Sequence, residues 1–136
     1  MSLLFYTHPV ALLHEAGPGH PESPLRLRAI LKALQQTELP GLARREAPVA
    51  GLGQIQRVHP ERYTTRILAS VPRQGFVRVD ADTVLNPHSG EAALRAAGAA
   101  CAAVDAVMAG ESKAAFCAMR PPGHHAESME AMGFCV

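Results

Sequence analysis

Paired cysteines are missing from this sequence. Its three cysteines, Cys101, Cys117 and Cys135, lie far apart, and none belongs to a Cys-x-x-Cys pair. This spacing argues against a zinc knuckle and against a redox site of the thioredoxin type. Free thiols suit a reducing compartment, so we expect a cytoplasmic protein.

A surplus of either charge is also missing, because 13 Lys and Arg residues face 12 Asp and Glu residues. The formal charge of +1 gives no general attraction to phosphates or anionic lipids, so direct nucleic-acid binding is not expected. The apolar start lacks a basic segment, is interrupted by His8 and Pro9, and is too short to span a membrane. We therefore expect a soluble protein without a membrane partner.

Short apolar runs alternate with helical patterns along the chain. Residues 24–37 read as a helix with Ser23 as N-cap and Pro24 in the first position. A second short helix is expected over 60–70, whereas 42–58 read ambiguously, with 47–53 resembling a strand end and a turn. Buried strands are expected over 3–7 and 113–119, and a half-buried strand over 76–80, followed by a polar loop.

The Ala-rich segment 89–109 predicts a long helix. Ser89 or Asn86 can cap its start, Glu91 and Arg95 form an i, i+4 pair, and Gly110 follows its end. Its residues are small and apolar nearly all round, so we expect it to be buried. Helices alternating with short apolar strands predict an α/β fold, with a mainly parallel sheet covered on both faces.

The strongest chemical signal is RPPGHHAE at 120–127, directly after a predicted strand. Ligands of open α/β sheets bind beyond the carboxyl ends of strands, and Pro121-Pro122 with Gly123 predict a rigid loop. His124 and His125 would then form an acid-base pair; the alternative is a solvated loop without function. Adjacent residues in extended chain point to opposite sides, so shared metal binding by the two is not expected.

Other catalytic patterns fail. His14-Glu15 is not followed by the second histidine of H-E-x-x-H, residues 51–56 lack the last glycine of G-x-G-x-x-G, and G-x-S-x-G is absent.

Three ordered segments resemble the zinc-dependent histone deacetylase superfamily. They are His20-Pro21-Glu22 with Pro24 and Arg26, DTVLNPHSGEAALRAAGA at 82–99, and RPPGHHAE with GFC at 133–135. The RPPGHHAE form is similar to the class II branch, which includes bacterial acetoin-utilisation proteins and acetylpolyamine amidohydrolases. The resemblance implies an arginase-like α/β/α fold, a zinc-bound water, and hydrolysis of an acetyl amide to an amine and acetate.

The resemblance also implies residue roles. His124 matches a histidine that stabilises the transition state, and His125 matches the general base that later protonates the leaving amine. The substrate-binding positions are Gly133, whose carbonyl accepts from the substrate amide, Phe134 in the tunnel wall, Arg26 in the cavity beneath the site, and Asp82 on the rim. The implied partner is an acetylated amine, either acetyl-lysine or an acetylpolyamine.

In the family the zinc ligands, a transition-state tyrosine and the carboxylates that orient the two histidines all follow GFC. The last aspartate here is Asp105 and the only tyrosines are Tyr6 and Tyr63, so no metal ligand is expected in this chain. GFCV would begin another buried strand. We therefore expect residues 1–136 to be the N-terminal part of a single deacetylase domain with an incomplete sheet. Alone, this part should be inactive and prone to unfold or aggregate.

Two other functions stay open. One is a truncated, non-catalytic binding or interaction module. The other is an unrelated hydrolase that uses the histidine pair without a metal. A homo-oligomer is also compatible with the sequence.

Overall fold

The structure, a computed structural model, describes residues 2–136. Its strands are β1 (Leu3–Thr7), β2 (Leu42–Glu46), β3 (Val77–Arg78), β4 (Val84–Leu85) and β5 (Ala114–Cys117). Its helices are the short 3-10 helix η1 (Pro9–Leu12), α1 (Pro24–Gln36), α2 (Leu52–Ile55), α3 (Glu61–Ala69) and α4 (Ser89–Met108). Within residues 2–136, no helix is both long enough and apolar enough to cross a membrane.

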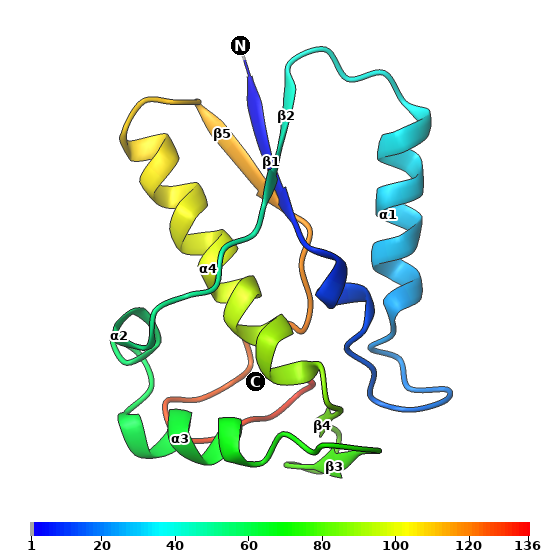
Figure 1. The fold of residues 1–136 in the computed structure, drawn as a ribbon, viewed down its shortest axis with the longest axis vertical. Coiled ribbons are helices and arrows are strands. Elements are labelled where there is room, and N and C mark those ends of the chain that lie inside the picture. The colour runs from blue at the N-terminus through cyan, green and yellow to red at the C-terminus, as the bar shows by residue number, and fades with distance from the viewer. Residues whose placement is uncertain (1) are drawn as a thin grey trace.

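β1 is the central strand of a sheet with the order β2-β1-β5. Both neighbours are parallel to it, with Leu3 opposite Leu42 on β2 and Ala114 on β5. Parallel neighbours need crossover connections, and here α1 lies between β1 and β2 in the chain while α4 precedes β5. Figure 1 shows the three strands between α1 on one side and α4 on the other.

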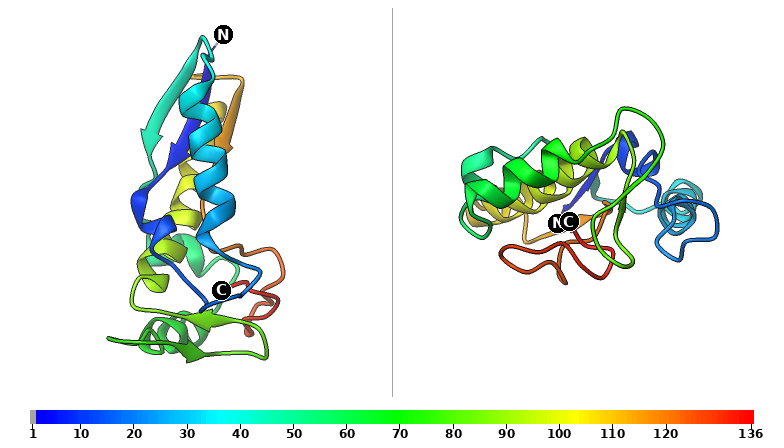
Figure 2. Two further views of the ribbon diagram at one scale, coloured as in Figure 1. Left: turned by 90° about the vertical axis from the view of Figure 1, so that its right-hand side faces the viewer. Right: turned by 90° about the horizontal axis from the view of Figure 1, so that it is seen from below.

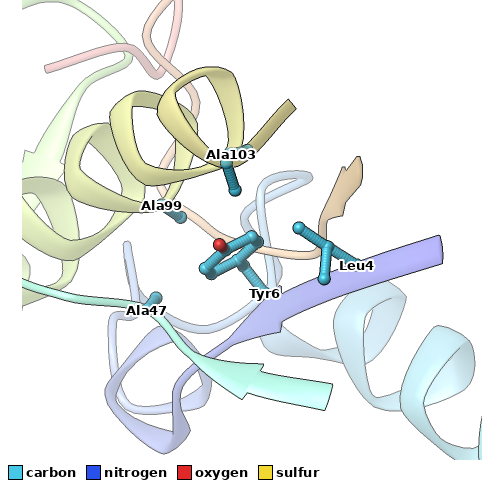
Figure 3. Packing of buried hydrophobic residues seen from close by; sticks show 6 residues of the cluster. Leu4, Tyr6, Ala47, Ala99 and Ala103 are labelled. Atoms are coloured by element: carbon cyan, nitrogen blue, oxygen red, sulfur yellow. The ribbon is translucent and has the colours of Figure 1, made fainter. Parts of the chain in front are cut away.

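Alternation along β1 explains these two helical layers. Leu4 and Tyr6 pack against Ala99 and Ala103 of α4, as Figure 3 shows, whereas Phe5 packs with Leu27 of α1. Successive side chains of a strand point to opposite faces, so one apolar strand supports both layers. The expected α/β/α arrangement with a mainly parallel sheet is therefore confirmed.

The small residues of α4 allow an unusually close contact with the loop after β2. A Cβ atom on Gly98 would lie 2.0 Å from the Pro48 carbonyl oxygen and 2.7 Å from the Ala50 nitrogen. The Ala50 N–H donates to the Leu94 carbonyl of α4 at 3.0 Å. Only glycine leaves room for this crossing.

The helix ends agree only in part with the sequence patterns. Ser23 does cap α1, because its Oγ accepts from the Leu25 N–H at 3.4 Å. The N-cap of α4 is His88, whose side chain makes no capping hydrogen bond. The prediction that Ser89 or Asn86 caps this helix is therefore wrong. Instead, Ser89 Oγ donates to Asn86 Oδ1 at 3.0 Å and accepts from the Asn86 N–H at 2.7 Å, and Asn86 Oδ1 also accepts from the His88 N–H at 3.1 Å.

At the other end of α4, the expected C′ glycine is confirmed. Gly110 has φ +76° and donates to the Val107 carbonyl at 3.0 Å, and Glu111 donates to the Ala106 carbonyl at 3.0 Å. These two bonds form a Schellman motif, which ends the helix. The pair within α4 is also present, with Arg95 Nε 2.8 Å from Glu91 Oε1.

Two strands differ from the expectation. The ambiguous segment begins with β2, whose polar sequence LARRE is typical of an edge position where side chains reach solvent. The strand expected over 76–80 is reduced to β3, and both its residues are exposed. Within the described part of the chain, β3 pairs with β4 outside the main sheet, and both its side chains are left uncovered there.

The prediction that α4 is buried all round is wrong for this chain. Val104 and Met108 are 61% and 81% exposed, and other residues of α4 line an apolar hollow of about 410 Å³ together with α3. β5 is an edge strand among the described residues, and its Phe116 is 44% exposed rather than buried. One face of α4 and one edge of β5 are thus uncovered within residues 2–136.

Candidate active site

A cavity of about 740 Å³ lies where β5 ends and α1 begins. All six residues that the sequence pointed to line it: Arg26, Asp82, His124, His125, Gly133 and Phe134. They come from the first turn of α1, the β3–β4 connection and the segment after β5. Figure 2 shows these distant parts of the chain meeting, with the orange-to-red segment beside the blue segment before α1.

The two adjacent histidines lie close together. The ring centroids of His124 and His125 are 4.2 Å apart with planes inclined by 53°, and both side chains are exposed. Both residues are in a turn rather than extended chain, so the expectation that the rings point to opposite sides is wrong. The pair therefore presents two imidazoles to one region.

Gly123 does not adopt a backbone conformation that only glycine favours. Its φ is not positive, and a Cβ atom there would meet no atom within 4 Å. The proline pair before it and the contacts described next hold the loop instead.

Gly133 makes a close contact with His125 that the sequence did not indicate. It has φ +59°, and a Cβ atom there would lie 3.0 to 3.1 Å from three atoms of the His125 side chain. The N–H of His125 also donates to the Sγ of buried Cys135 at 3.3 Å. Gly133 and Cys135 therefore determine where the His125 imidazole lies.

Residues 132–135 form a tight turn, so the prediction that GFCV begins a buried strand is wrong here. Met132 and Cys135 exchange backbone hydrogen bonds of 3.2 and 2.9 Å, and Phe134 has φ +69°. The N–H of Gly133 donates to Asp82 Oδ1 at 3.2 Å. The N–H of Phe134 donates to Thr83 Oγ1 at 3.1 Å. Asp82 is thus bound to the turn as well as lining the cavity.

His20 completes this rim. Its ring meets the Phe134 ring edge-on at 4.8 Å between centroids, and its Nε2 lies 3.0 Å from the Asp82 carbonyl oxygen. Its Nδ1 accepts from the Glu22 N–H at 3.1 Å, so the proton lies on Nε2. The sequence showed His20 only as part of a motif; its contact with Phe134 depends on segments more than 100 residues apart.

A buried ionic cluster of Arg120, Glu22 and His14 lies beneath the rim. The sequence did not indicate that these residues contact one another. Arg120 and Glu22 form a two-point pair, with Nε–Oε1 at 2.8 Å and Nη2–Oε2 at 2.5 Å. Arg120 Nη1 also donates to the carbonyls of Ala11 and His14, both at 2.6 Å. Burial alone would raise the pKa of Glu22, but hydrogen bonds from His14 and Arg120 and their positive charge lower it to about 2.

α3 and the residues just before it hold the middle of the loop that carries the histidines. Arg66 Nη2 donates to the Met129 carbonyl at 2.6 Å, and His59 Nδ1 donates to the Ser128 carbonyl at 3.1 Å. The His59 ring stacks on Tyr63 at 4.7 Å between centroids. The loop is therefore fixed at its start, its middle and its end.

A zinc site is not formed within residues 2–136. Within residues 2–136, no group of three or more His, Cys, Asp or Glu side chains is placed to hold a metal ion. The residues described here therefore do not fit the metal centre that the resemblance implies. What the cavity does offer is a pair of imidazoles, an aromatic wall, a carboxylate and a guanidinium.

Comparisons with known proteins agree on one family. Residues 20–136 match the family described as the histone deacetylase domain. The chain is 37% identical to the histone deacetylase-like amidohydrolase of Pseudomonas aeruginosa, a match that covers 96% of this chain and 39% of that protein. It is 36% identical to a probable deacetylase of Archaeoglobus fulgidus, covering 94% of this chain and 36% of that protein.

A solved structure agrees as well. The HD domain of HDA15 superposes with a TM-score of 0.90 at 32% identity, covering 97% of this chain and 40% of that one. The chain thus spans about two fifths of the length of these relatives. Because the family match covers most of the chain and the fold agrees, this chain belongs to the histone deacetylase family.

Proposed function

We propose that the protein is a zinc-dependent deacetylase that removes acetyl groups from acetyl-lysine or from acetylpolyamine-type amines. In this proposal, residues 1–136 supply the acid-base histidines and part of the substrate tunnel, as the N-terminal part of one deacetylase domain. The observation that carries the proposal is the pair of imidazoles 4.2 Å apart at one cavity, with His125 held against Gly133.

The proposed roles follow from this placement. His125 takes a proton from the attacking water and returns it to the leaving amine, and His124 stabilises the charge that develops in the transition state. Two neighbouring imidazoles can divide these tasks only if both face the same carbonyl, and their inclination of 53° at 4.2 Å brings them to one region.

Substrate binding is assigned to the remaining lining residues. The Gly133 carbonyl accepts a hydrogen bond from the substrate amide, and Phe134 forms one wall of an apolar tunnel. The edge-on contact of Phe134 with His20 narrows the mouth, and Asp82 presents a carboxylate on the rim. Arg26 lies in the cavity, where its positive charge suits the acetate product.

Zinc is assigned to residues outside the described chain, because residues 2–136 contain no suitable ligand group. Elemental analysis of the 136-residue chain and of the full-length gene product tests this assignment. We expect stoichiometric zinc only in the full-length product. Stoichiometric zinc in the short chain would contradict the assignment.

Turnover tests the function itself. His125→Ala in the full-length gene product should lower hydrolysis of an acetyl-lysine peptide or an acetylpolyamine by about 10²-fold or more, since the general base is removed. His88→Ala is the matched control, because His88 is exposed and its side chain makes no capping bond. Unchanged turnover of the His125 variant would refute the proposal.

A non-catalytic binding module is the second candidate. It is favoured by a cavity that has its rim and wall but no metal ligands among residues 2–136. Binding of an acetylated peptide to the full-length product, without hydrolysis and without zinc, would support this candidate over the enzyme.

A further inference from the structure

The cluster around Arg120 is charged, deeply buried and unused by the proposed chemistry. Arg120, Glu22 and His14 are 4%, 8% and 2% exposed. His14 Nε2 lies 3.4 Å from Glu22 Oε2, and His14 Nδ1 lies 2.7 Å from Ser89 Oγ at the start of α4. A chain of polar contacts thus links α4 to the segment that carries the histidine pair.

Stability alone is a weak reason for such a cluster. Taking charges out of water costs several kcal/mol for each ion, and apolar residues of similar volume often stabilise a core as well or better. Buried ionic groups can instead fix one arrangement of the chain. The geometry around Arg120 indicates which arrangement is fixed.

Arg120 joins the three segments that meet at the cavity. Its Nη1 binds two carbonyls in the segment after β1, its Nε and Nη2 bind Glu22 just before α1, and its own backbone starts the histidine loop. Every nitrogen of the guanidinium is engaged. Lysine has one compact ammonium group and cannot reproduce this planar, three-directional contact.

The position of Arg120 is transmitted directly to the histidines. His124 follows it by four residues, and Pro121 and Pro122 between them have fixed φ and no N–H. Pro121 is buried, so the start of the loop has little freedom to adjust. A shift of the guanidinium should therefore move the imidazoles rather than be absorbed on the way.

We propose that Glu22 and Arg120 are positioning residues for the His124–His125 pair, setting its orientation relative to α1 and the segment after β1. Both also line the candidate cavity, and the role proposed for them is to hold the histidines rather than to act on the substrate. This inference rests on the proposed function, because orientation is useful only if the pair transfers protons to a bound substrate.

The test compares three variants of the full-length gene product. Arg120→Lys keeps the charge and loses the two-point geometry, and Glu22→Gln keeps the shape and loses the charge. Glu91→Gln is the control, since Glu91 forms an exposed ion pair with Arg95 on α4, away from the cavity. We expect kcat to fall about 10- to 100-fold in the first two variants with KM within about twofold, and no change in the control, because small misplacements of catalytic groups cost this much.

A second measurement does not depend on activity. The ring ¹⁵N chemical shifts of His124 and His125 report tautomer and hydrogen bonding, and we expect them to change in Arg120→Lys and Glu22→Gln but not in Glu91→Gln. If kcat and these shifts stay as in the wild type while thermal stability falls, the pair is only structural and the proposal is overturned. If Arg120→Lys does not fold, the kcat and the imidazole shifts of Glu22→Gln decide between a positioning role and a purely structural one.

This design separates the two proposals. A wild-type protein without deacetylase activity would refute the function, whereas the imidazole shifts would still show whether Glu22 and Arg120 orient the histidines.

Discussion

Replacing Gly133 by alanine adds one methyl group at the point where the 132–135 turn meets His125. Two effects follow. A non-glycine residue at φ +59° costs about 1 to 2 kcal/mol. The new Cβ atom would also lie 3.0 Å from the His125 Cβ, whereas carbon atoms prefer about 3.5 to 4.0 Å. The His125 side chain must therefore move by about 0.5 to 1 Å.

The control for this variant is Gly110→Ala. Gly110 also has positive φ, at +76°, but a Cβ atom there would meet nothing within 4 Å. Both variants should lose about 1 to 2 kcal/mol of unfolding free energy in urea titrations. Only Gly133→Ala should also lose turnover, by about 10- to 100-fold in a steady-state deacetylation assay, because His125 is displaced. Equal turnover in the two variants would refute the reasoning.

Three further changes test the fold. Gly98→Ala should destabilise the protein by about 1 to 3 kcal/mol in urea unfolding despite a helix-propensity gain of about 1 kcal/mol, because the methyl meets backbone at 2.0 Å. Gly53→Ala is the control and should not destabilise the protein, because a Cβ atom there would meet nothing within 4 Å. A larger loss of stability in Gly53→Ala than in Gly98→Ala would contradict the packing argument. Since the pKa of Glu22 is lowered from 4.5 to about 2, its charge contributes stability that is present above about pH 4.5 and lost as pH falls toward 2. Glu22→Gln should reduce the loss of unfolding free energy between about pH 4.5 and pH 2 by up to about 3 kcal/mol. An unchanged pH dependence of the unfolding free energy would count against the ion pair. Among residues 2–136 the buried hydroxyl of Tyr63 has no hydrogen-bond partner, so Tyr63→Phe should leave the melting temperature unchanged or raise it. Tyr6→Phe should lower it, because the Tyr6 hydroxyl donates to a carbonyl of α4.

Local patterns predicted the elements whose ends depend on their own residues. Ser23-Pro24 marked the start of α1, and Gly110 marked the end of α4, because capping chemistry is local. β2 was missed since an exposed edge strand such as LARRE has no apolar alternation. β3 was placed correctly but its burial was wrong, because burial depends on whether another layer covers it.

The candidate site was predicted through motifs rather than through geometry. All six residues chosen from the sequence line one cavity, but the sequence did not show that Gly133 packs on His125 or that Asp82 binds the 132–135 turn. The Gly133–His125 contact joins residues about 8 positions apart and the Asp82–Gly133 bond joins residues 51 positions apart, and both depend on how the strands and helices are arranged. The proton-bearing nitrogen of His20 likewise becomes evident only from its partners.

The pairing of Glu22 with Arg120 has a consequence for biosynthesis. The two residues are 98 positions apart. At about 5 to 20 residues per second, a ribosome needs about 5 to 20 s to add that length. During this interval β1, α1 and β2 can associate, while the Glu22 carboxylate still lacks the arginine that compensates its burial. The cavity is therefore among the last parts of this chain to form, and nascent chains stalled before residue 120 should keep the segment before α1 accessible to proteases.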